Sequence, residues 1–308
     1  MADLIATHAE LARIGIDRWV ETYGKDRKKV YPRMGWKKLT TTQQYERMRQ
    51  EGGFTYAPVV NEAAQIVPQS FNTGYQKDYY WVKRGLGYRC SIEKLETDQY
   101  KIVAKAAAEK MAIAMNKTKE STAANIWNNM TSTATGYVGA DAVALVSASH
   151  PYDGGTWSNR GTGASNTDVD FSYTALEDAL AKLLATVDEK GIPDPKVGPF
   201  KLFVPNELVG PANRVVKAMR LPGTNDNDPN YAGGMISEVV GNPWFTDVDA
   251  WMLQSADEAE HGMIELTHGS RRVTKKPYEE TEEFAWFMTE KWLFHHVNAR
   301  GVWGTVGA

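Results

Sequence analysis

The chain has 308 residues, enough for two domains or for one large body with a sizeable core. Its hydrophobic content of 42% and charged content of 24% are ordinary for a soluble globular protein, and its net charge of −3 carries no general signature of a nucleic-acid-binding or membrane-surface protein. No segment approaches the roughly 20 apolar residues of a membrane span. The single cysteine, Cys90, excludes an intrachain disulfide and fits a reducing compartment.

Charge is unevenly distributed along the chain. Residues 1–50 hold eleven Lys or Arg against six Asp or Glu, whereas Glu279, Glu280, Glu282 and Glu283 form an acidic cluster near the other end. Solvated surface is the simpler interpretation of both. Pairing of the two regions between subunits is the alternative.

The first ninety residues change character twice. Residues 2–23 have apolar side chains at roughly helical spacing and predict a helix, and residues 30–42 read as an extended connector. Residues 52–88 contain glycines and prolines that forbid a long helix, together with β-branched and aromatic residues that favour strands. A two-stranded loop that is buried against a neighbouring molecule explains this stretch, because a single hairpin is only marginally stable alone. Leu86, Tyr88, Cys90 and Ile92 alternate like a half-buried strand.

Residues 91–130 predict the longest helix of the chain. They contain no proline or glycine and are rich in strong helix formers, with Glu96, Thr97 and Asp98 suited to the start of a helix. One long helix, or two shorter ones broken near residues 116–118, satisfies the pattern. The expected apolar face is loose and interrupted by Glu109 and Asn116; its members are Ile102, Ala106, Ile113, Ala124 and Trp127.

The remainder predicts an α/β body. Residues 142–147 read as a short strand, and Ser172 or Thr174 caps a helix, with Thr174 and Glu177 fitting a capping box. A strand at 201–204 leads into a helix that ends near Met219 and is divided or delayed by Pro211. Residues 221–234 read as a surface loop, residues 235–240 and 251–254 as strands, and residues 263–306 as mostly strand.

Motifs for catalysis and cofactor binding are missing from the sequence. There is no Gly-x4-Gly-Lys-Ser/Thr loop and no Gly-x-Ser-x-Gly elbow. No histidine pair has metal-ligand spacing, and His295 and His296 in a strand are expected to point to opposite faces. His150 precedes a Pro-Tyr-Asp-Gly-Gly turn and reads as a turn residue, and Cys90 reads as a packed small residue. We therefore expect no catalytic residue, no metal and no cofactor; a soluble Cys/His hydrolase is the remote alternative.

Several segments resemble one protein family in the right order. Residues 145–159, LVSASHPYDGGTWSN, resemble the L-x-S-x-x-H-P … G-G-T-x-S-N signature of tailed-phage major capsid proteins, the branch typified by Mu-like head subunits. Four further segments resemble parts of the same family. Residues 85–98 resemble the entry to its spine helix, and residues 200–208 resemble its L-x-V-P-x-x-L strand–helix. Residues 242–253 resemble a strand pair beyond that helix, and residues 298–303 resemble the closing strand.

The resemblance implies the α+β Hong Kong 97-type capsid fold. That fold has an N-terminal arm, an extended β-hairpin E-loop, a peripheral domain with a long spine helix, and an axial domain. The expected division is 1–45 for the arm, 46–90 for the E-loop, 91–170 for the peripheral domain, 171–262 for the axial domain, and 263–308 for the return to the peripheral domain.

The implied function is structural: self-assembly into the icosahedral shell, with hexamers and pentamers, that encloses phage double-stranded DNA. The implied setting is the virion, after assembly in the host bacterial cytoplasm, with a portal and scaffolding or decoration proteins as further partners and no membrane. An encapsulin-like nanocompartment is the alternative. The expected inter-subunit contacts are Phe54, Tyr56, Val59, Ile66, Phe71 and Tyr75. The candidates for contact with DNA or an acidic neighbour are Lys25, Arg27, Lys28 and Lys29.

Overall fold

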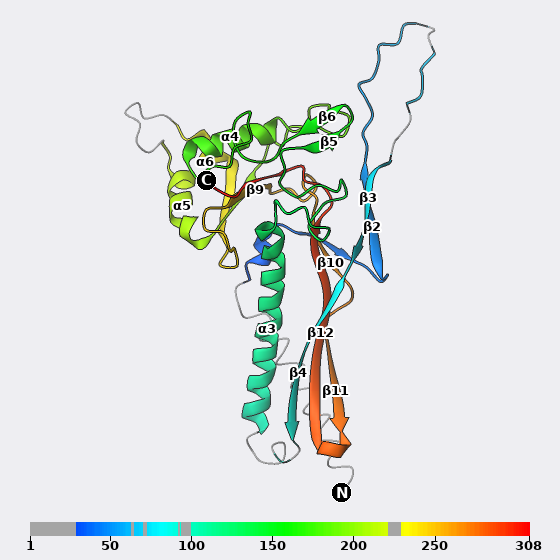
Figure 1. Ribbon diagram of the computed structural model, residues 1–308, viewed down its shortest axis with the longest axis vertical. Helices are drawn as coiled ribbons and strands as arrows, with labels where there is room; N and C mark the ends of the chain where they lie inside the picture. Colours follow the sequence, from blue (N-terminus) through cyan, green and yellow to red (C-terminus); the bar gives the residue numbers. More distant parts are fainter. Residues whose placement is uncertain (1–28, 63–64, 70–72, 92, 94–99, 221–228) are drawn as a thin grey trace.

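The computed structural model describes residues 29–62, 65–69, 73–91, 93, 100–220 and 229–308. In Figure 1 the molecule is elongated: a long helix and long strands form a shaft, helices and a second sheet form a head, and a hairpin projects beside the head. The helix expected over residues 2–23 and the helix-start residues at 96–98 lie outside the described residues. Within the described part, no helix is long and apolar enough to cross a membrane.

The shaft is built on a single helix, α3, which spans Tyr100–Asn128. The prediction of a long helix is confirmed, and the alternative of two helices broken near Asn116 is wrong. Asn116 is buried, and its side-chain oxygen accepts a hydrogen bond from Arg271 at 3.0 Å. The hydroxyl of Thr118 donates to the Ala114 carbonyl at 2.9 Å, so both polar residues are satisfied without breaking the helix.

The buried face of α3 differs from the predicted one. Ala124 and Trp127 are buried as expected, but Ala106 and Ile113 are only half-buried. The other buried apolar residues of α3 are mostly Ala and Met: Ala108, Met111, Ala112, Met115, Ala123 and Ile126. Alanine gives a weak amphipathic signal even where it is fully buried, so the sequence pattern understated this face.

The long strand β12, Glu283–His296, organises the shaft sheet. It pairs antiparallel with β4 (Val82–Ser91), β11 (Arg272–Tyr278) and β10 (Met263–Thr267). Alternate residues Trp286, Met288, Trp292 and Phe294 share one hydrophobic core with α3. The prediction of a strand here is confirmed, and the alternation puts every second side chain on one face.

Strand β4 is buried unevenly. Cys90 lies in the shaft core, as the sequence indicated, whereas Leu86 is exposed and Ile92 lies outside the described residues. The expected half-buried pattern is therefore met only at the end of β4.

The stretch expected to be an extended connector is partly ordered. It contains a 3₁₀ helix, Tyr31–Met34, and strand β1, Lys37–Thr40, which pairs in parallel with β10. Met34 and Trp36 are buried in the shaft core, which explains why the segment does not remain a free connector.

The head has its own sheet and core. Its strands are β13 (Val302–Thr305), β9 (Trp251–Ser255), β7 (Phe200–Val204) and β8 (Ile236–Gly241), in that order. The helices of the head are α4 (Tyr173–Leu184), α5 (Val209–Lys217) and α6 (Tyr231–Met235). A 3₁₀ turn, Asn206–Leu208, comes directly before α5. Leu176, Leu180 and Leu183 pack into its core with Trp251 and Trp303, whose rings lie 4.5 Å apart.

The head departs from the prediction in two places. Helix α4 begins after Ser172, whose hydroxyl accepts from the Ala175 N–H at 3.2 Å, so the expected Thr174–Glu177 capping box is not formed. Glu177 instead accepts from the Tyr173 hydroxyl at 2.6 Å. Helix α6 occupies the end of the segment expected to be a loop; residues 221–228 lie outside the described part.

The expected strand at 142–147 is also wrong. The segment has one isolated bridge, Val138 to Ala144, and no ladder. The buried side chain of Asn159 takes the place of a neighbouring strand: its oxygen accepts from the Ser147 N–H at 2.8 Å and its nitrogen donates to the Leu145 carbonyl at 2.8 Å. A short hairpin of β5 (His150–Tyr152) and β6 (Gly155–Trp157) then confirms the predicted turn.

Candidate functional site: the projecting hairpin and its seat

The hairpin consists of β2 (Tyr45–Glu51) and β3 (Thr73–Tyr80) and extends away from the head and shaft (Figure 1). The guanidinium of Arg47 donates to both carboxylate oxygens of Asp78 at 2.6 and 2.8 Å, and the rings of Tyr45 and Tyr80 lie 5.5 Å apart. These cross-strand pairs hold the two strands in register. The predicted two-stranded loop is therefore present, and its strands end at Tyr80.

The described residues beyond these strands, 52–62 and 65–69, have no regular structure and carry exposed apolar side chains. Val59 is 95% exposed and Ile66 is 73% exposed. The same holds for others in the expected contact set, Phe54, Tyr56 and Tyr75, and for Val60 and Val67. Phe71 lies outside the described residues. So many exposed apolar groups in one segment are typical of a surface that another molecule covers.

The root of the hairpin is fixed to the rest of the chain by two side chains of β3. Tyr79 is buried, and its hydroxyl donates to the His296 carbonyl at 2.9 Å while its ring meets that of His295 at 5.1 Å. The ammonium of Lys77 donates to the Val138 carbonyl at 2.6 Å. Burial lowers the pKa of Lys77 and raises the pKa of Tyr79 well above its ordinary value. We call Lys77, Tyr79, residues 135–141, His150 and the His295–His296 pair the hairpin seat.

The seat brings together histidines that the sequence did not connect. The rings of His295 and His296 stack at 5.0 Å, so the expectation that they point to opposite faces is wrong. Strand β12 ends here, and the Nδ1 atom of His295 accepts from the His296 N–H at 2.8 Å, which turns its ring back. His150 lies 2.8 Å from Asp141, through Nδ1 and a carboxylate oxygen, and its ring stacks on Trp157. Within the described residues, no three His, Cys, Asp or Glu side chains are placed to hold a metal.

Of the four basic candidates, only Lys29 lies in the described residues. Burial lowers the pKa of Lys29, and the nearby Arg271 and Lys119 lower it further, while Glu290 and Glu120 oppose this. The carboxylate of Glu120 accepts from the backbone N–H groups of Val30 and Tyr31, each at 2.8 Å. Lys29 therefore has acidic neighbours within its own chain. Lys25, Arg27 and Lys28 lie outside the described residues.

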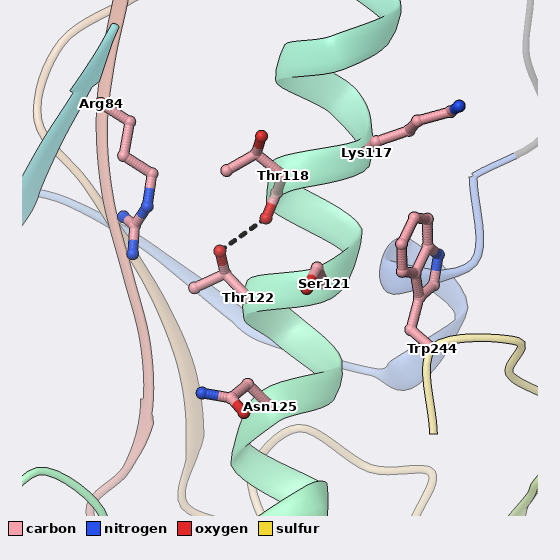
Figure 2. A pocket seen from close by; sticks show the side chains of 7 residues that line it. All are labelled: Arg84, Lys117, Thr118, Ser121, Thr122, Asn125 and Trp244. Carbon is pink, nitrogen blue, oxygen red and sulfur yellow. Dashed lines mark hydrogen bonds between the residues drawn. The ribbon is translucent and has the colours of Figure 1, made fainter. Parts of the chain in front are cut away.

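A shallow cavity of about 500 Å³ lies across the solvent side of α3 (Figure 2). In Figure 2, Arg84 from β4 stands on one side of the helix and Trp244 on the other. Thr122 donates to the Thr118 carbonyl at 2.6 Å, and Asn125 donates to the Tyr137 hydroxyl at 2.8 Å, so these polar groups are engaged locally. The lining is Arg84, Lys117, Thr118, Ser121, Thr122, Asn125 and Trp244. It contains neither an acidic side chain nor a histidine that could activate a nucleophile.

The shaft, the head and the projecting hairpin define the class of protein. They form the Hong Kong 97-type architecture of capsid shell subunits, with the long helix α3 as the spine. The fold is similar to the capsid of an empty GTA particle, with 10% identity, a TM-score of 0.56, and coverage of 91% of this chain and 90% of that one. It is also similar to the mature capsid of bacteriophage PhiM1, with 8% identity, a TM-score of 0.54, and coverage of 91% and 87%.

The family follows from the sequence. Residues 74–306, well over half of the chain, match the model of the phage capsid protein family, and the chain belongs to that family. No curated protein matches the chain. The chain is accordingly a major capsid protein with a structural role, which favours the phage head over the encapsulin-like alternative.

Proposed function

We propose that copies of this chain close into a shell through the hairpin tip, which lies over a neighbouring copy. The observation that carries this is the exposure of Val59 and Ile66 on a segment that projects beyond both cores. Covering such side chains stabilises an interface by roughly 1.5–3 kcal/mol for each one fully buried. In a closed shell the same contact recurs at every subunit, so a modest energy per contact suffices.

The test replaces both residues by serine, Val59→Ser with Ile66→Ser, in the full chain. We expect the variant to remain folded by circular dichroism but to give no closed particles by negative-stain imaging and sedimentation. The matched control is Val248→Ser, because Val248 is 51% exposed but lies outside the hairpin. Particles of normal yield and stability from the double variant would refute the tip contact.

The remaining inter-subunit contacts that we propose are Phe54 and Tyr56 in the same segment, Tyr75 in β3, and Phe71, which lies outside the described residues. For the chain as a whole we propose an arm at 1–45, an E-loop at 46–90, a peripheral domain at 91–170 and 263–308, and an axial domain at 171–262. The helix α3 and the sheet around β12 support the peripheral assignment, and the separate core around β7 supports the axial one, to whose sheet β13 adds a strand from the last segment. Assignment to the Mu-like branch stays a prediction.

We further propose that the shell encloses double-stranded DNA within a virion assembled in the bacterial cytoplasm, with portal and scaffolding or decoration proteins as partners and without catalysis by this chain. Lys25, Arg27 and Lys28 are candidates for phosphate contacts, which are independent of base sequence and weakened by salt. Lys28→Glu should reduce the nucleic acid retained in purified particles, measured by absorbance ratio at rising salt. If Lys28→Glu leaves the amount of retained nucleic acid unchanged, the proposal that the arm contacts DNA is refuted. If the particles contain no nucleic acid at all, the encapsulin-like nanocompartment is favoured instead.

A further inference from the structure

The hairpin seat contains a polar side chain that the rest of the seat leaves unsatisfied. His296 is buried, and neither of its ring nitrogens has a hydrogen-bond partner among the described residues. The Nε2 atom of His150 is in the same state, while its Nδ1 atom is taken by Asp141. A neutral imidazole carries one donor and one acceptor, so burying both without partners costs free energy. An apolar side chain would fill the same space without that cost.

The residue with the unsatisfied imidazole, His296, also holds the hairpin through its backbone. The hydroxyl of Tyr79 donates to the backbone carbonyl of His296 itself, at 2.9 Å. Two residues earlier, on the same face of β3, Lys77 donates to the Val138 carbonyl. Gly139 closes the seat from the side: a Cβ atom there would lie 3.0 Å from His296 Nε2 and 2.8 Å from a carboxylate oxygen of Asp141. Any rearrangement of the His296 ring therefore acts on the root of the hairpin.

The charges that face His296 cannot balance an added proton. From β12 comes His295, with its ring 5.0 Å away; from β5 comes His150; and from β3 come the ammonium of Lys77 and the hydroxyl of Tyr79. The acidic group in the seat is Asp141, which already lies against His150 and attracts Lys77. A protonated His296 would thus add a second positive charge beside Lys77 around one engaged carboxylate. Protonation favours a state in which the ring reaches water.

We propose that the seat is a proton-operated latch for the hairpin: while the His296 ring is neutral the seat holds β3 through Tyr79 and Lys77, and protonation of His296 opens it and frees the hairpin to change its angle. Burial lowers the pKa of His296 well below its ordinary value, and burial lowers the pKa of His295 to about 4, in agreement with a closed seat that excludes protons. The latch is a property of one chain and does not depend on the proposed tip contact.

The size of the effect follows from linkage. We assume that His296 regains the ordinary pKa of 6.5 when the seat opens. At pH 5, which lies about 1.5 units below that pKa, the exposed ring is protonated roughly thirty times as often as it is neutral. Lowering the pH to 5 therefore multiplies the equilibrium constant for opening roughly thirtyfold. Opening exposes the backbone amides of residues 135–141, whereas β3 stays paired with β2 and moves with it. These amides report the latch directly.

The experiment is hydrogen exchange, followed by mass spectrometry, on the full chain at pH 7.5 and pH 5. The wild type is compared at each pH with His296→Met, so that the chemical effect of pH on exchange cancels. We expect wild-type peptides from residues 135–141 to lose protection by roughly thirtyfold at pH 5. In His296→Met the loss should be smaller by about that factor, because methionine fills the site without titrating and His295 is then the buried histidine of the seat that still responds.

Two controls separate a latch from general acid unfolding. His261→Met removes another buried histidine whose pKa burial lowers to about 4, but His261 lies against Gln254, outside the seat, so this variant should keep the wild-type response. Peptides from β7 should stay protected in all proteins at pH 5. If His296→Met does not fold, His296→Gln supplies a second non-titrating side chain with the same expectation. Wild-type protection of residues 135–141 that is independent of pH, or a loss of protection that is undiminished in both His296 variants, would overturn the latch.

Discussion

The ammonium of Lys119 lies 2.7 Å from a carboxylate oxygen of Glu265, in the middle of the shaft, and both side chains are buried. Glu290 adds a second carboxylate at 3.2 Å from Lys119 and is itself bound by Arg271 at 2.8 Å. Burial raises the pKa of the Glu290 carboxyl, but Lys119 and Arg271 together outweigh burial and hold that pKa below its usual value. The group ties α3 to β10 and β12 through charges that depend on one another.

Removing the cation from this group should destabilise the subunit strongly. We expect Lys119→Met to lower the free energy of unfolding by about 3–5 kcal/mol, because it leaves two buried carboxylates with one cation fewer. Chemical denaturation measures the loss. Lys117→Met is the matched control, since Lys117 lies exposed on the same helix and should change stability by less than about 0.5 kcal/mol. Equal effects of the two variants would contradict a buried ionic group.

Asn159 should be irreplaceable for a different reason. Its amide oxygen accepts a hydrogen bond from the Ser147 N–H at 2.8 Å. Its amide nitrogen donates to the Leu145 carbonyl at 2.8 Å and to the Val302 carbonyl at 3.1 Å. Asn159→Ala would leave these buried backbone groups without partners, at a cost of roughly 1–3 kcal/mol for each one left unsatisfied. Thermal unfolding of Asn159→Ala and of Asn125→Ala, an exposed position, should differ by many degrees. Similar melting temperatures would show that water replaces the amide.

Stability should fall in weak acid because two further histidines are buried. Burial lowers the pKa of both His261 and His295 from the ordinary 6.5 to about 4. Above pH 6.5 the two histidines are unprotonated in both the folded and the unfolded chain, so their contribution to stability is constant. Between pH 6.5 and 4 they bind protons in the unfolded chain but not in the folded chain, so the free energy of unfolding declines. Each site contributes up to roughly 3 kcal/mol to this decline. The test is to measure the free energy of unfolding of the wild type and of His261→Gln by denaturation at several pH values across this range. If the two proteins lose stability in parallel as the pH falls, the decline would be assigned to carboxylates.

The cap of α4 separates two residues that the sequence left as alternatives. Ser172→Ala should cost about 1 kcal/mol, because the Ala175 N–H loses its acceptor. Thr174→Ala should cost little or nothing, since Thr174 lies inside the first turn and alanine favours a helix. Urea denaturation of the two variants decides the question. A larger loss for Thr174→Ala would restore the capping box.

Elements with a strong local cause could be predicted from the sequence. Forty residues without glycine or proline specify α3, and the alternation from Phe284 to Met288 specifies β12. The apolar hairpin segment was also predictable, because its side chains have no place in a compact core. Residues 145–159 signalled the family, and Asn159 gives that motif a physical role.

Features that depend on distant partners were beyond the sequence. The α3 face could not be predicted because Ala108 and Ala112 are core residues only within a cluster that includes Trp286 and Trp292, which come much later in the chain. The hairpin seat joins β3, β5 and the end of β12, so no local pattern marks His296 or Tyr79 as neighbours. The absence of a strand at 142–147 likewise depends on a side chain, Asn159, that comes later in the chain.

The pairing of β4 with β12 has a consequence for the order of events during synthesis. The guanidinium of Arg84 donates to the Trp292 carbonyl, 208 residues further on, so β4 and α3 leave the ribosome long before the strand that covers them. We expect the shaft to close only when the last residues of β12 are made, which delays a mature subunit surface until translation is nearly complete. Nascent chains stalled at residue 282 should therefore be cut by protease within β4 and α3, whereas released full-length chains should resist.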